Sequence, residues 1–388
     1  MYYKNPLTYL IPLLFIILFI TNLAVVQEQQ FTLLAQSFIS HHLDIVNIGD
    51  DISDTAYFNG KYFWPLGPFP AIILLPFVIF YKDFPQSYIS FPLSVLNFYL
   101  LFKIAKHFRV NTQKALLLAT FFVFGSIYTP VAGIPGSWYF AQTVATTLTI
   151  VAIYEFLTKR RLFLIGLLLG AAVATRFNII FAAIFFIPYL IGKSTIKNVF
   201  LFFLPIAISL SLLGIYNYSR FQNPLEHGYN LQLIVEEPRL RRDKGLFSIT
   251  HLPANLYYMV LKGPDPIFLN SSHILKPPFV TFDSYGLSIF FLSPILFLLY
   301  KSNLKDKQSK MAALTSIILL IPILTYYGIG QRQVGFRYAL DLFPFLYLLL
   351  IDPVQKTGLR TLYILIFFGV FFSIFFTFNY LNGIYTSP

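Results

Sequence analysis

The chain has 388 residues, of which 57% are hydrophobic and 11% are charged, whereas charged residues make up roughly 25% of a typical soluble domain. This composition excludes an ordinary soluble protein and predicts an integral membrane protein. The chain has no cysteine, which excludes disulfides and thiolate chemistry. Its net charge of +12 would suggest a nucleic-acid partner in a soluble protein. Here we expect no nucleic acid, because basic residues in the short loops of a membrane protein fix its orientation.

Residues 8–26 (TYLIPLLFIILFITNLAVV) form the first apolar segment. The segment is long enough to cross a hydrocarbon core about 30 Å thick, which needs about 20 helical residues. Its apolar stretch is longer than the roughly 7–15 residues of a signal-peptide core, and no small-residue cleavage site follows it. We therefore interpret it as a membrane span. Residues 361–380 form a similar segment near the other end of the chain.

Clusters of Lys and Arg separate the later apolar segments, and we expect all of them to face the cytoplasm. Segment 68–81 then has to be a short helix in or against the outer leaflet, which agrees with its length of about 14 residues and its two prolines. The fold predicted is an all-α integral membrane protein of about eleven transmembrane helices, with the N-terminus inside and the C-terminus outside. The remaining segments pair as out-and-back crossings: 115–131 with 137–157, 162–175 with 178–191, 198–216 with 286–300, and 311–328 with 338–352.

Two long connections, residues 27–86 and 217–285, fall on the outer face in this topology. Both contain polar residues, aromatic residues and turn signals, so we expect the chemistry to lie there. The predicted organisation has three parts. They are an N-terminal transmembrane module (1–216) with a catalytic first outer loop (27–86), a long outer-face loop (217–285), and the C-terminal transmembrane helices (286–388).

Asp50, Asp51 and Asp54 spell DDxxD just after the first span. On a helix, such a motif holds Mg²⁺ on a diphosphate, as in prenyltransferases, but those enzymes need a second acidic motif facing the first. Asn59-Gly60 between aromatic flanks predicts a tight hairpin instead. Other interpretations are a solvated acidic loop, or a helix cap formed by Asp50. An acid at this membrane boundary can also take a proton from an acceptor hydroxyl.

The residues that follow resemble a known signature. Asp54-Thr-Ala-Tyr57, Asn59-Gly-Lys-Tyr62 and Pro65-Leu-Gly-Pro68-Phe-Pro70 are similar to the N-terminal region of GT-C glycosyltransferases. The similarity is closest to the bacterial polyprenyl-phosphate-sugar branch, which is related to protein mannosyltransferases and aminoarabinose transferases. It implies a GT-C fold with juxtamembrane helices in the outer loops, and a loop carboxylate that acts as base or orients the acceptor. Asp54 matches best, with Asp44, Asp50 and Asp51 as alternatives, and Tyr57 and Tyr62 are candidates for acceptor or sugar binding.

Two turns place arginines at the predicted outer boundary. Arg176 in Ala-Thr-Arg either snorkels to lipid headgroups or binds a lipid phosphate bidentately. Arg337 in Gly-Phe-Arg-Tyr338 either pairs with Asp341, four residues on, or contacts the donor phosphate. Arg332 faces the same side. The family resemblance favours phosphate binding by both turns.

A third set opens the second long connection. Its sequence Asn-Tyr-Ser-Arg220-Phe-Gln222-Asn-Pro is similar to the family pattern Asn-x-x-Arg-Phe-Gly-(Asn/Ser)-Pro, with Gln222 in place of glycine. Arg220 is therefore a candidate phosphate-binding residue. Glu226 and His227 either contact the acceptor or are merely solvated. The basic run at 239–244 is either a solvated face or steers anionic donor lipids.

These residues together suggest a hexosyl or pentosyl transferase of the cell envelope. It would move a sugar from a polyprenyl-phosphate donor to a hydroxyl-bearing lipid, glycan or protein on the outer face of the membrane. The sequence has no Gly-rich nucleotide-binding loop, and no metal or other cofactor is required. A divalent cation would have only the acidic cluster as a site, because His227, His251 and His273 lack ligand spacing. Alternatives are a transporter or flippase of lipid or oligosaccharide, and a polysaccharide polymerase or ligase with its catalytic residues in one late large loop.

Overall fold

The computed structural model describes residues 6–386 except 47–48, 50–51, 191–194 and 270–272. These residues are mostly helical and include two antiparallel two-stranded hairpins. The chain forms two compact units, each discontinuous in sequence. Unit 1 contains Met1–Ile17, Leu101–Gly133 and Phe247–Pro388, and unit 2 contains Leu18–Leu100 and Ile134–Leu246. Two helices, α1 (Leu7–Ala24) and α4 (Ser87–His107), contribute residues to both units.

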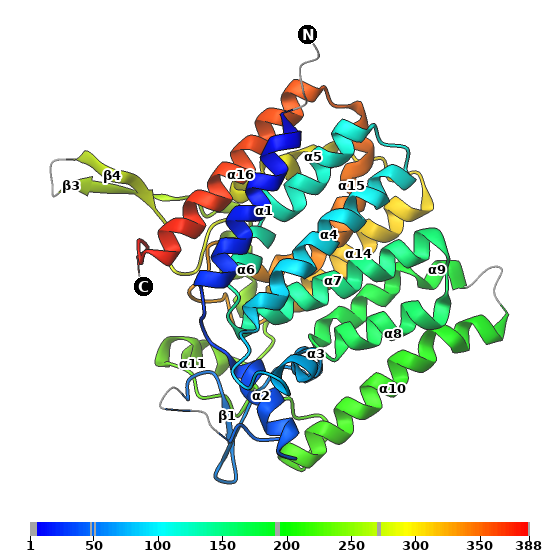
Figure 1. The fold of residues 1–388 in the computed structure, drawn as a ribbon, viewed down its shortest axis with the longest axis vertical. Helices are drawn as coiled ribbons and strands as arrows, with labels where there is room; N and C mark the ends of the chain where they lie inside the picture. The colour runs from blue at the N-terminus through cyan, green and yellow to red at the C-terminus, as the bar shows by residue number, and fades with distance from the viewer. Residues whose placement is uncertain (1–5, 47–48, 50–51, 191–194, 270–272, 387–388) are drawn as a thin grey trace. The chain divides into compact units, whose positions relative to one another are not determined.

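Unit 2 is built around α7 (Ser137–Thr158), which is buried along most of its length. Apolar and small side chains on all sides of α7 suit a helix with no solvent-facing side. Helix α8 (Leu162–Val173) contacts both α7 and α10 (Ile196–Phe221), as Figure 1 shows. The other elements of this unit are α2 (Gln30–Ile39), β1 (Ala56–Phe58), β2 (Lys61–Phe63), α3 (Phe69–Val78), the 3₁₀ segment Phe177–Phe185, α9 (Ile187–Leu190) and α11 (Glu236–Arg242).

Glycines allow α8 and α10 to approach closely. A Cβ atom on Gly166 would lie 2.1 Å from the carbonyl oxygen of Phe202, and one on Gly170 would lie 3.0 Å from that of Pro205. Small residues at the contact are a common way for transmembrane helices to pack. Since the two contacts follow the same order along both helices, α8 and α10 run in the same direction.

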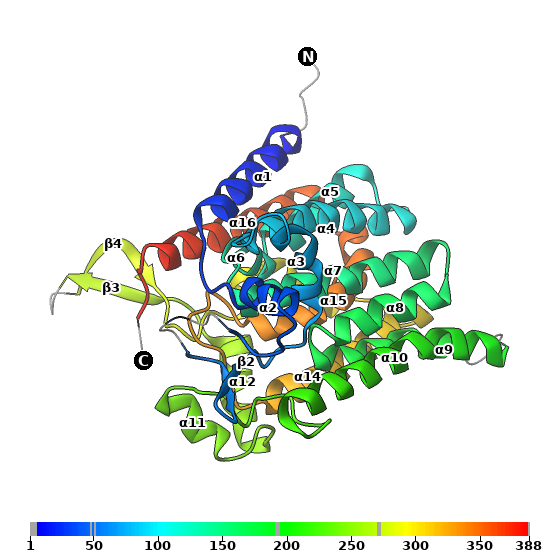
Figure 2. The same ribbon diagram turned by 60° about the horizontal axis from the view of Figure 1, so that its bottom comes forward.

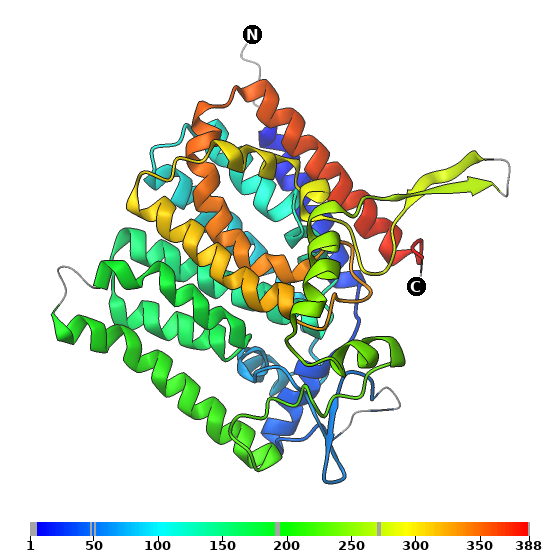
Figure 3. The ribbon, with the colours of Figure 1, turned by 180° about the vertical axis from the view of Figure 1, so that it is seen from behind.

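Unit 1 packs α5 (Thr112–Phe124) against α16 (Leu359–Leu381), and α14 (Lys307–Thr325) against α15 (Phe343–Lys356), the yellow and orange helices of Figure 3. Glycine again permits a close contact, because a Cβ atom on Gly369 would lie 2.7 Å from the Gly125 carbonyl oxygen. The other elements are α6 (Tyr128–Gly133), the 3₁₀ turn Ile249–His251, α12 (Leu252–Leu256), the π-helical turn Tyr257–Leu261, β3 (Asp265–Leu269), β4 (Ile274–Thr281), α13 (Ile289–Leu292) and the 3₁₀ segments Pro294–Lys301 and Arg337–Leu342.

Seven helical segments among the described residues are long and apolar enough to cross a membrane. The predominance of helix is confirmed, and the seven segments agree with a membrane protein, whereas the predicted eleven spans are not all present as long helices. The predicted spans 115–131, 162–175, 178–191 and 286–300 are shorter helices or are broken into α and 3₁₀ pieces. The long segments are Leu7–Ala24, Ser87–His107, Ser137–Thr158, Ile196–Phe221, Lys307–Thr325, Arg337–Lys356 and Leu359–Leu381.

Both long connections carry short helices, as predicted. Segment 68–81 forms the ten-residue helix α3. The Asn59-Gly60 signal is also confirmed, because β1 and β2 pair around that turn. The sequence did not predict the second hairpin, β3–β4.

The basic clusters between the predicted spans gather at one end of each unit, whereas the basic run 239–244 of unit 2 belongs to the second long connection. In unit 1, Lys114 Nζ donates to the Gln355 carbonyl at 2.6 Å, and Ser302 Oγ donates to the Leu349 carbonyl at 3.0 Å. Arg337 lies at the opposite end of α15, just before the helix begins. The clusters that share the C-terminal end of α15 are 103–114, 301–310 and 356–360.

Unit 2 also has basic clusters at one end and single arginines at the other. Lys159–Arg161 directly precedes α8, and Lys197 lies in the first turn of α10. Because the two helices are parallel, these cations share one end of the unit. Arg176 follows α8, and Arg220 lies in the last turn of α10. The two arginines therefore share the other end.

Candidate functional site

Asp54 lies where the two long connections join within unit 2. Its backbone N–H donates to the Leu233 carbonyl at 2.9 Å, and Tyr57 N–H donates to the Leu231 carbonyl at 3.1 Å. Residues 231–233 thus run antiparallel alongside β1 and extend the β1–β2 hairpin. Asp54 has a φ of +62°, a left-handed conformation that Asp tolerates better than most residues.

The Asp54 carboxylate accepts hydrogen bonds from neutral side chains on both of its oxygens. Trp138 Nε1 donates to Oδ2 at 3.1 Å, and Gln232 Nε2 donates to Oδ1 at 3.2 Å. Trp138 belongs to the first turn of α7, whereas Gln232 comes from the second long connection. Donors on both oxygens fix the direction of a half-buried carboxylate, which is the preorganisation that proton transfer requires.

The two tryptophans of the chain meet beside this carboxylate. The rings of Trp64 and Trp138 lie 5.0 Å apart between centroids. The Trp64 carbonyl accepts a hydrogen bond from Arg220 Nη1 at 2.7 Å, and Arg220 Nη2 donates to Asn217 Oδ1 at 2.7 Å. The guanidinium also lies 3.9 Å from the centroid of the Tyr216 ring. Arg220 thereby fastens the first long connection to the end of α10.

The Arg176 turn packs directly on the same connection. A Cβ atom on Gly67 would lie 2.0 Å from the Ala174 carbonyl oxygen, and Phe69 N–H donates to that oxygen at 3.2 Å. Only glycine fits at position 67 with this backbone. Arg176 is buried two residues further on. The structure therefore brings the Arg176 turn and the segment 65–70 together, two of the motifs that carry the family resemblance.

His227 lies between Arg220 and the Arg176 turn. Its Nδ1 is 3.3 Å from the Asn217 amide nitrogen, and its ring is 5.1 Å from that of Phe177 between centroids. Burial lowers the pKa of His227, the Arg220 charge lowers the pKa further, and Glu226 opposes both. His227 is thus a packed, neutral residue of the site.

Glu226 and Arg242 of the basic run form hydrogen bonds with the backbone of the second long connection itself. Glu226 Oε1 accepts a hydrogen bond from the Gly228 backbone at 2.6 Å, which shapes the turn. Arg242 Nη1 donates to the carbonyls of Tyr229 and Gln232 at 3.0 and 2.8 Å. Arg242 therefore supports the strand that holds Asp54, a role that the sequence did not predict.

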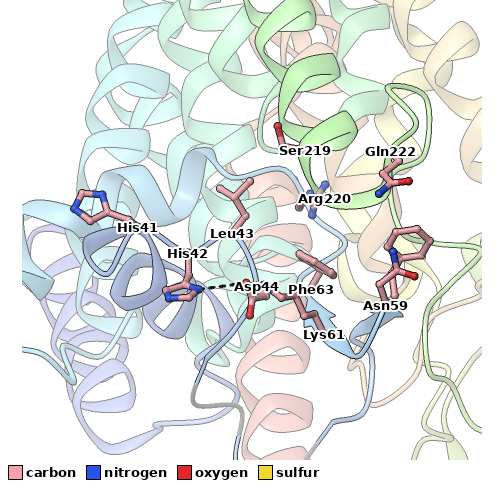
Figure 4. Close-up of a pocket in the computed structure, with 11 residues that line it drawn as sticks. His41, His42, Leu43, Asp44, Asn59, Lys61, Phe63, Ser219, Arg220 and Gln222 are labelled. Carbon is pink, nitrogen blue, oxygen red and sulfur yellow. Dashed lines mark hydrogen bonds and ion pairs between the residues drawn. The ribbon is translucent and has the colours of Figure 1, made fainter.

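A pocket of about 400 Å³ opens beside the β1–β2 hairpin (Figure 4). Tyr57 and Tyr62 pair across the hairpin with their rings 5.1 Å apart. They lie on the opposite face from the pocket, because strand residues alternate. The lining residues are His41, His42, Leu43, Asp44, Phe58, Asn59, Lys61, Phe63, Ser219, Arg220 and Gln222.

Asp44, an alternative to Asp54, is held in an ion pair at this pocket. Its Oδ1 lies 3.1 Å from Lys61 Nζ and 3.6 Å from His42 Nδ1. Burial acts to raise the pKa of Asp44, but the hydrogen bond and charge of Lys61 outweigh burial, so the pKa is lowered. A carboxylate with a lowered pKa is a weaker base, which disfavours Asp44 for proton removal.

The remaining predicted phosphate-binding residues belong to unit 1. Arg337 is buried, and its guanidinium donates to the Gln331 carbonyl at 3.2 Å and to the Tyr338 hydroxyl at 3.5 Å. Asp341, the alternative ion-pair partner, is also buried. Arg332 is exposed with a φ of +50°. The role of these residues in donor binding stays a prediction.

Asp50 and Asp51 lie outside the described residues, so their predicted roles stay open. Asp54 precedes β1 in a turn and is not on a helix, unlike the helical diphosphate motif. Within the described part of the chain, no group of three His, Asp or Glu residues is placed to hold a metal ion.

Sequence reasoning missed the residues that position Asp54. Trp138 looks like an interfacial aromatic residue at the end of a span, and Gln232 has no motif around it. The one feature of the sequence that could have drawn attention to Trp64 and Trp138 is that they are the two tryptophans among 388 residues.

No family model, curated protein or solved structure matches this chain. The resemblance to GT-C glycosyltransferases therefore rests on the quoted residues alone.

Proposed function

We propose that this chain is an integral-membrane glycosyltransferase that moves a hexose or pentose from a polyprenyl-phosphate donor to a hydroxyl-bearing acceptor. The observation that carries the proposal is the setting of Asp54. Its carboxylate is fixed by Trp138 and Gln232, in the unit that also holds Arg176 and Arg220 at the end opposite to its basic clusters.

In the proposed reaction, Asp54 accepts the proton of the acceptor hydroxyl as its oxygen bonds to the anomeric carbon of the sugar. The bond from that carbon to the donor phosphate breaks, and polyprenyl phosphate leaves with the bonding electron pair. Arg176 stabilises the negative charge that develops on the phosphate, because a fixed guanidinium in a water-poor site needs little reorganisation. Arg220 contributes mainly by holding the Trp64 backbone.

The position of the basic clusters at one end of each unit favours a lipid-linked donor. If the basic ends face the cytoplasm, Asp54 and Arg176 lie at the outer face of the cell membrane. A donor anchored by a polyprenyl chain reaches this side with its sugar, whereas nucleotide sugars belong to the cytoplasm. Tyr57, Tyr62 and His227 are proposed acceptor-side residues of unit 2, and the donor-phosphate role that the family resemblance implies for Arg337, Arg332 and Tyr338 of unit 1 is a separate prediction.

The proposal is tested with purified protein in liposomes, radiolabelled polyprenyl-phosphate sugars and a membrane extract as the source of acceptor. We expect label to move from the lipid donor to an acceptor fraction, and no transfer from nucleotide sugars. Arg176→Gln should raise the KM for the donor roughly 10- to 100-fold, the effect of losing a charged hydrogen bond. The exposed Arg239 on α11 provides the matched control, Arg239→Gln.

Movement of intact lipid between leaflets without sugar transfer would support the flippase alternative and sink the proposal. Polymer growth that survives loss of the Asp54 carboxylate would instead favour a polymerase or ligase.

A further inference from the structure

The β3–β4 hairpin of unit 1 exposes mainly apolar side chains. In Figures 1 and 2 it projects beside the C-terminal end of α16, away from the helices of its unit. It makes no part of the proposed sugar-transfer site. The exposed apolar residues are Phe268 (42%), Leu269 (48%), Ile274 (61%), Leu275 (48%) and Phe279 (52%).

Both faces of this hairpin are apolar. Phe268 pairs with Leu275, and Leu269 pairs with Ile274. Since successive strand residues point to opposite faces, each face carries one of these pairs. An antiparallel sheet that meets water normally has a polar face, and a lone two-stranded hairpin is at best marginally stable in water. Bulk water therefore suits neither face.

The base of the hairpin is fixed at the end of a membrane-spanning helix. Thr281 Oγ1 donates to the Ile384 carbonyl at 3.2 Å, and Thr386 N–H donates to the Phe282 carbonyl at 3.0 Å. Ile384 and Thr386 lie within a few residues of Leu381, where α16 ends. Helix α16 is long and apolar enough to span a membrane. The hairpin thus starts at the depth where α16 leaves the hydrocarbon layer.

Hydrocarbon alone does not suit the hairpin either. The outer edges of a two-stranded hairpin carry unpaired N–H and C=O groups, which lipid tails cannot satisfy. The exposed Lys276 lies between the apolar residues, and the Lys262–Asp265 ion pair (2.7 Å) marks the start of β3. The headgroup layer accommodates apolar side chains, polar edges and a lysine at the same depth.

We propose that the β3–β4 hairpin lies in the headgroup layer of the leaflet reached by the C-terminal end of α16, as an interfacial anchor. The hairpin's binding partner is therefore the lipid surface, and Lys276 lies beside lipid phosphates. The competing occupant is a second copy of the chain, which would pair with the open hairpin edges.

The absence of cysteine from the native chain makes single-cysteine spin labelling direct. We would label Phe268→Cys and Ile274→Cys, on opposite faces of the hairpin, in liposomes of phosphatidylcholine and phosphatidylglycerol. Phe371→Cys, exposed on α16, is the lipid reference, and the exposed Lys244→Cys is the water reference. The readout is spin relaxation by oxygen compared with relaxation by a water-soluble nickel chelate.

We expect the oxygen-to-nickel ratio at both hairpin positions to be several-fold above the Lys244 reference and below the Phe371 reference. Ratios equal to the water reference at both positions would overturn the proposal. Spin–spin broadening that disappears when unlabelled protein is added would also overturn it, in favour of contact between copies. Neither readout depends on sugar transfer, so the result stands apart from the proposed function.

Discussion

Arg220 links the first long connection to the end of α10 through a single side chain. It donates to the Trp64 carbonyl and to Asn217, and it stacks on Tyr216. Its Nε is buried without a hydrogen-bond partner among the described residues, at the wall of the pocket beside the hairpin. An uncompensated buried donor of this kind costs about 1–3 kcal/mol. We therefore interpret Arg220 as a positioning residue.

His227 gives the site a defined pH dependence. Its pKa lies below the ordinary 6.5 because of burial and the Arg220 charge, so the unfolded chain binds the proton more readily than the folded chain. Stability from this group is complete above about pH 6.5 and is lost as the pH falls below it. We expect the thermal unfolding midpoint to fall between pH 7.5 and 5.5, and His227→Gln to reduce that fall.

The control for this experiment is His273→Gln, because His273 is exposed on the β3–β4 hairpin. It should leave the pH dependence of the midpoint as it is in the native chain. An unchanged dependence in His227→Gln would show that His227 is not the buried neutral group described here.

At the scale of elements, the contact between the segment 65–70 and the turn after α8 depends on Gly67. A methyl group at this position would lie 2.0 Å from the Ala174 carbonyl oxygen, so Gly67→Ala must push the two segments apart. Overpacking of this kind typically costs about 1–3 kcal/mol. We expect a lower thermal midpoint and slower sugar transfer. Gly263→Ala, where no atom lies within 4 Å of the added methyl, should change neither, and an inert Gly67→Ala would refute the contact.

Local signals in the sequence predicted some elements well. Asn59-Gly60 predicted the first hairpin, since a two-residue turn of this type fixes its own geometry. The prolines of segment 68–81 predicted a short helix. Local signals could not predict the pairing of residues 54–57 with 231–233. This pairing joins backbone groups far apart in the chain and requires no particular side chains. The supports of Asp54 at Trp138 and Gln232 were missed for the same reason.

The broken spans have a related cause. Hydropathy over 178–191 predicts one apolar helix, but the backbone is 3₁₀ over Phe177–Phe185 and α-helical only over Ile187–Leu190. Composition measures how apolar a segment is and not which hydrogen-bond ladder it forms. A 3₁₀ segment of nine residues followed by an α-helical turn of four therefore looks the same in sequence as one helix. A segment of this length is also shorter than the about 20 residues that a span needs.

At the scale of the whole molecule, the basic ends of both units predict its orientation in the membrane. Cations in short loops stay on the cytoplasmic side, so Lys305 should face the cytoplasm and Lys244, in the second long connection, should face outward. The measurement is labelling of Lys244→Cys and Lys305→Cys in intact cells with a membrane-impermeant maleimide. We expect Lys244→Cys to react at once and Lys305→Cys to react only after permeabilisation. The reverse pattern would place the proposed site in the cytoplasm and remove the case for a lipid-linked donor.

Sugar transfer at Asp54 is tested most directly by the rate of transfer in Asp54→Asn at saturating donor. The amide keeps the size of the side chain but cannot accept the acceptor proton, so kcat should fall by roughly 10²- to 10⁴-fold with the donor KM unchanged. Asp83→Asn, the same change at an exposed residue of the first long connection, should keep the native rate. Native-like kcat in Asp54→Asn would contradict the assignment of Asp54 as the base.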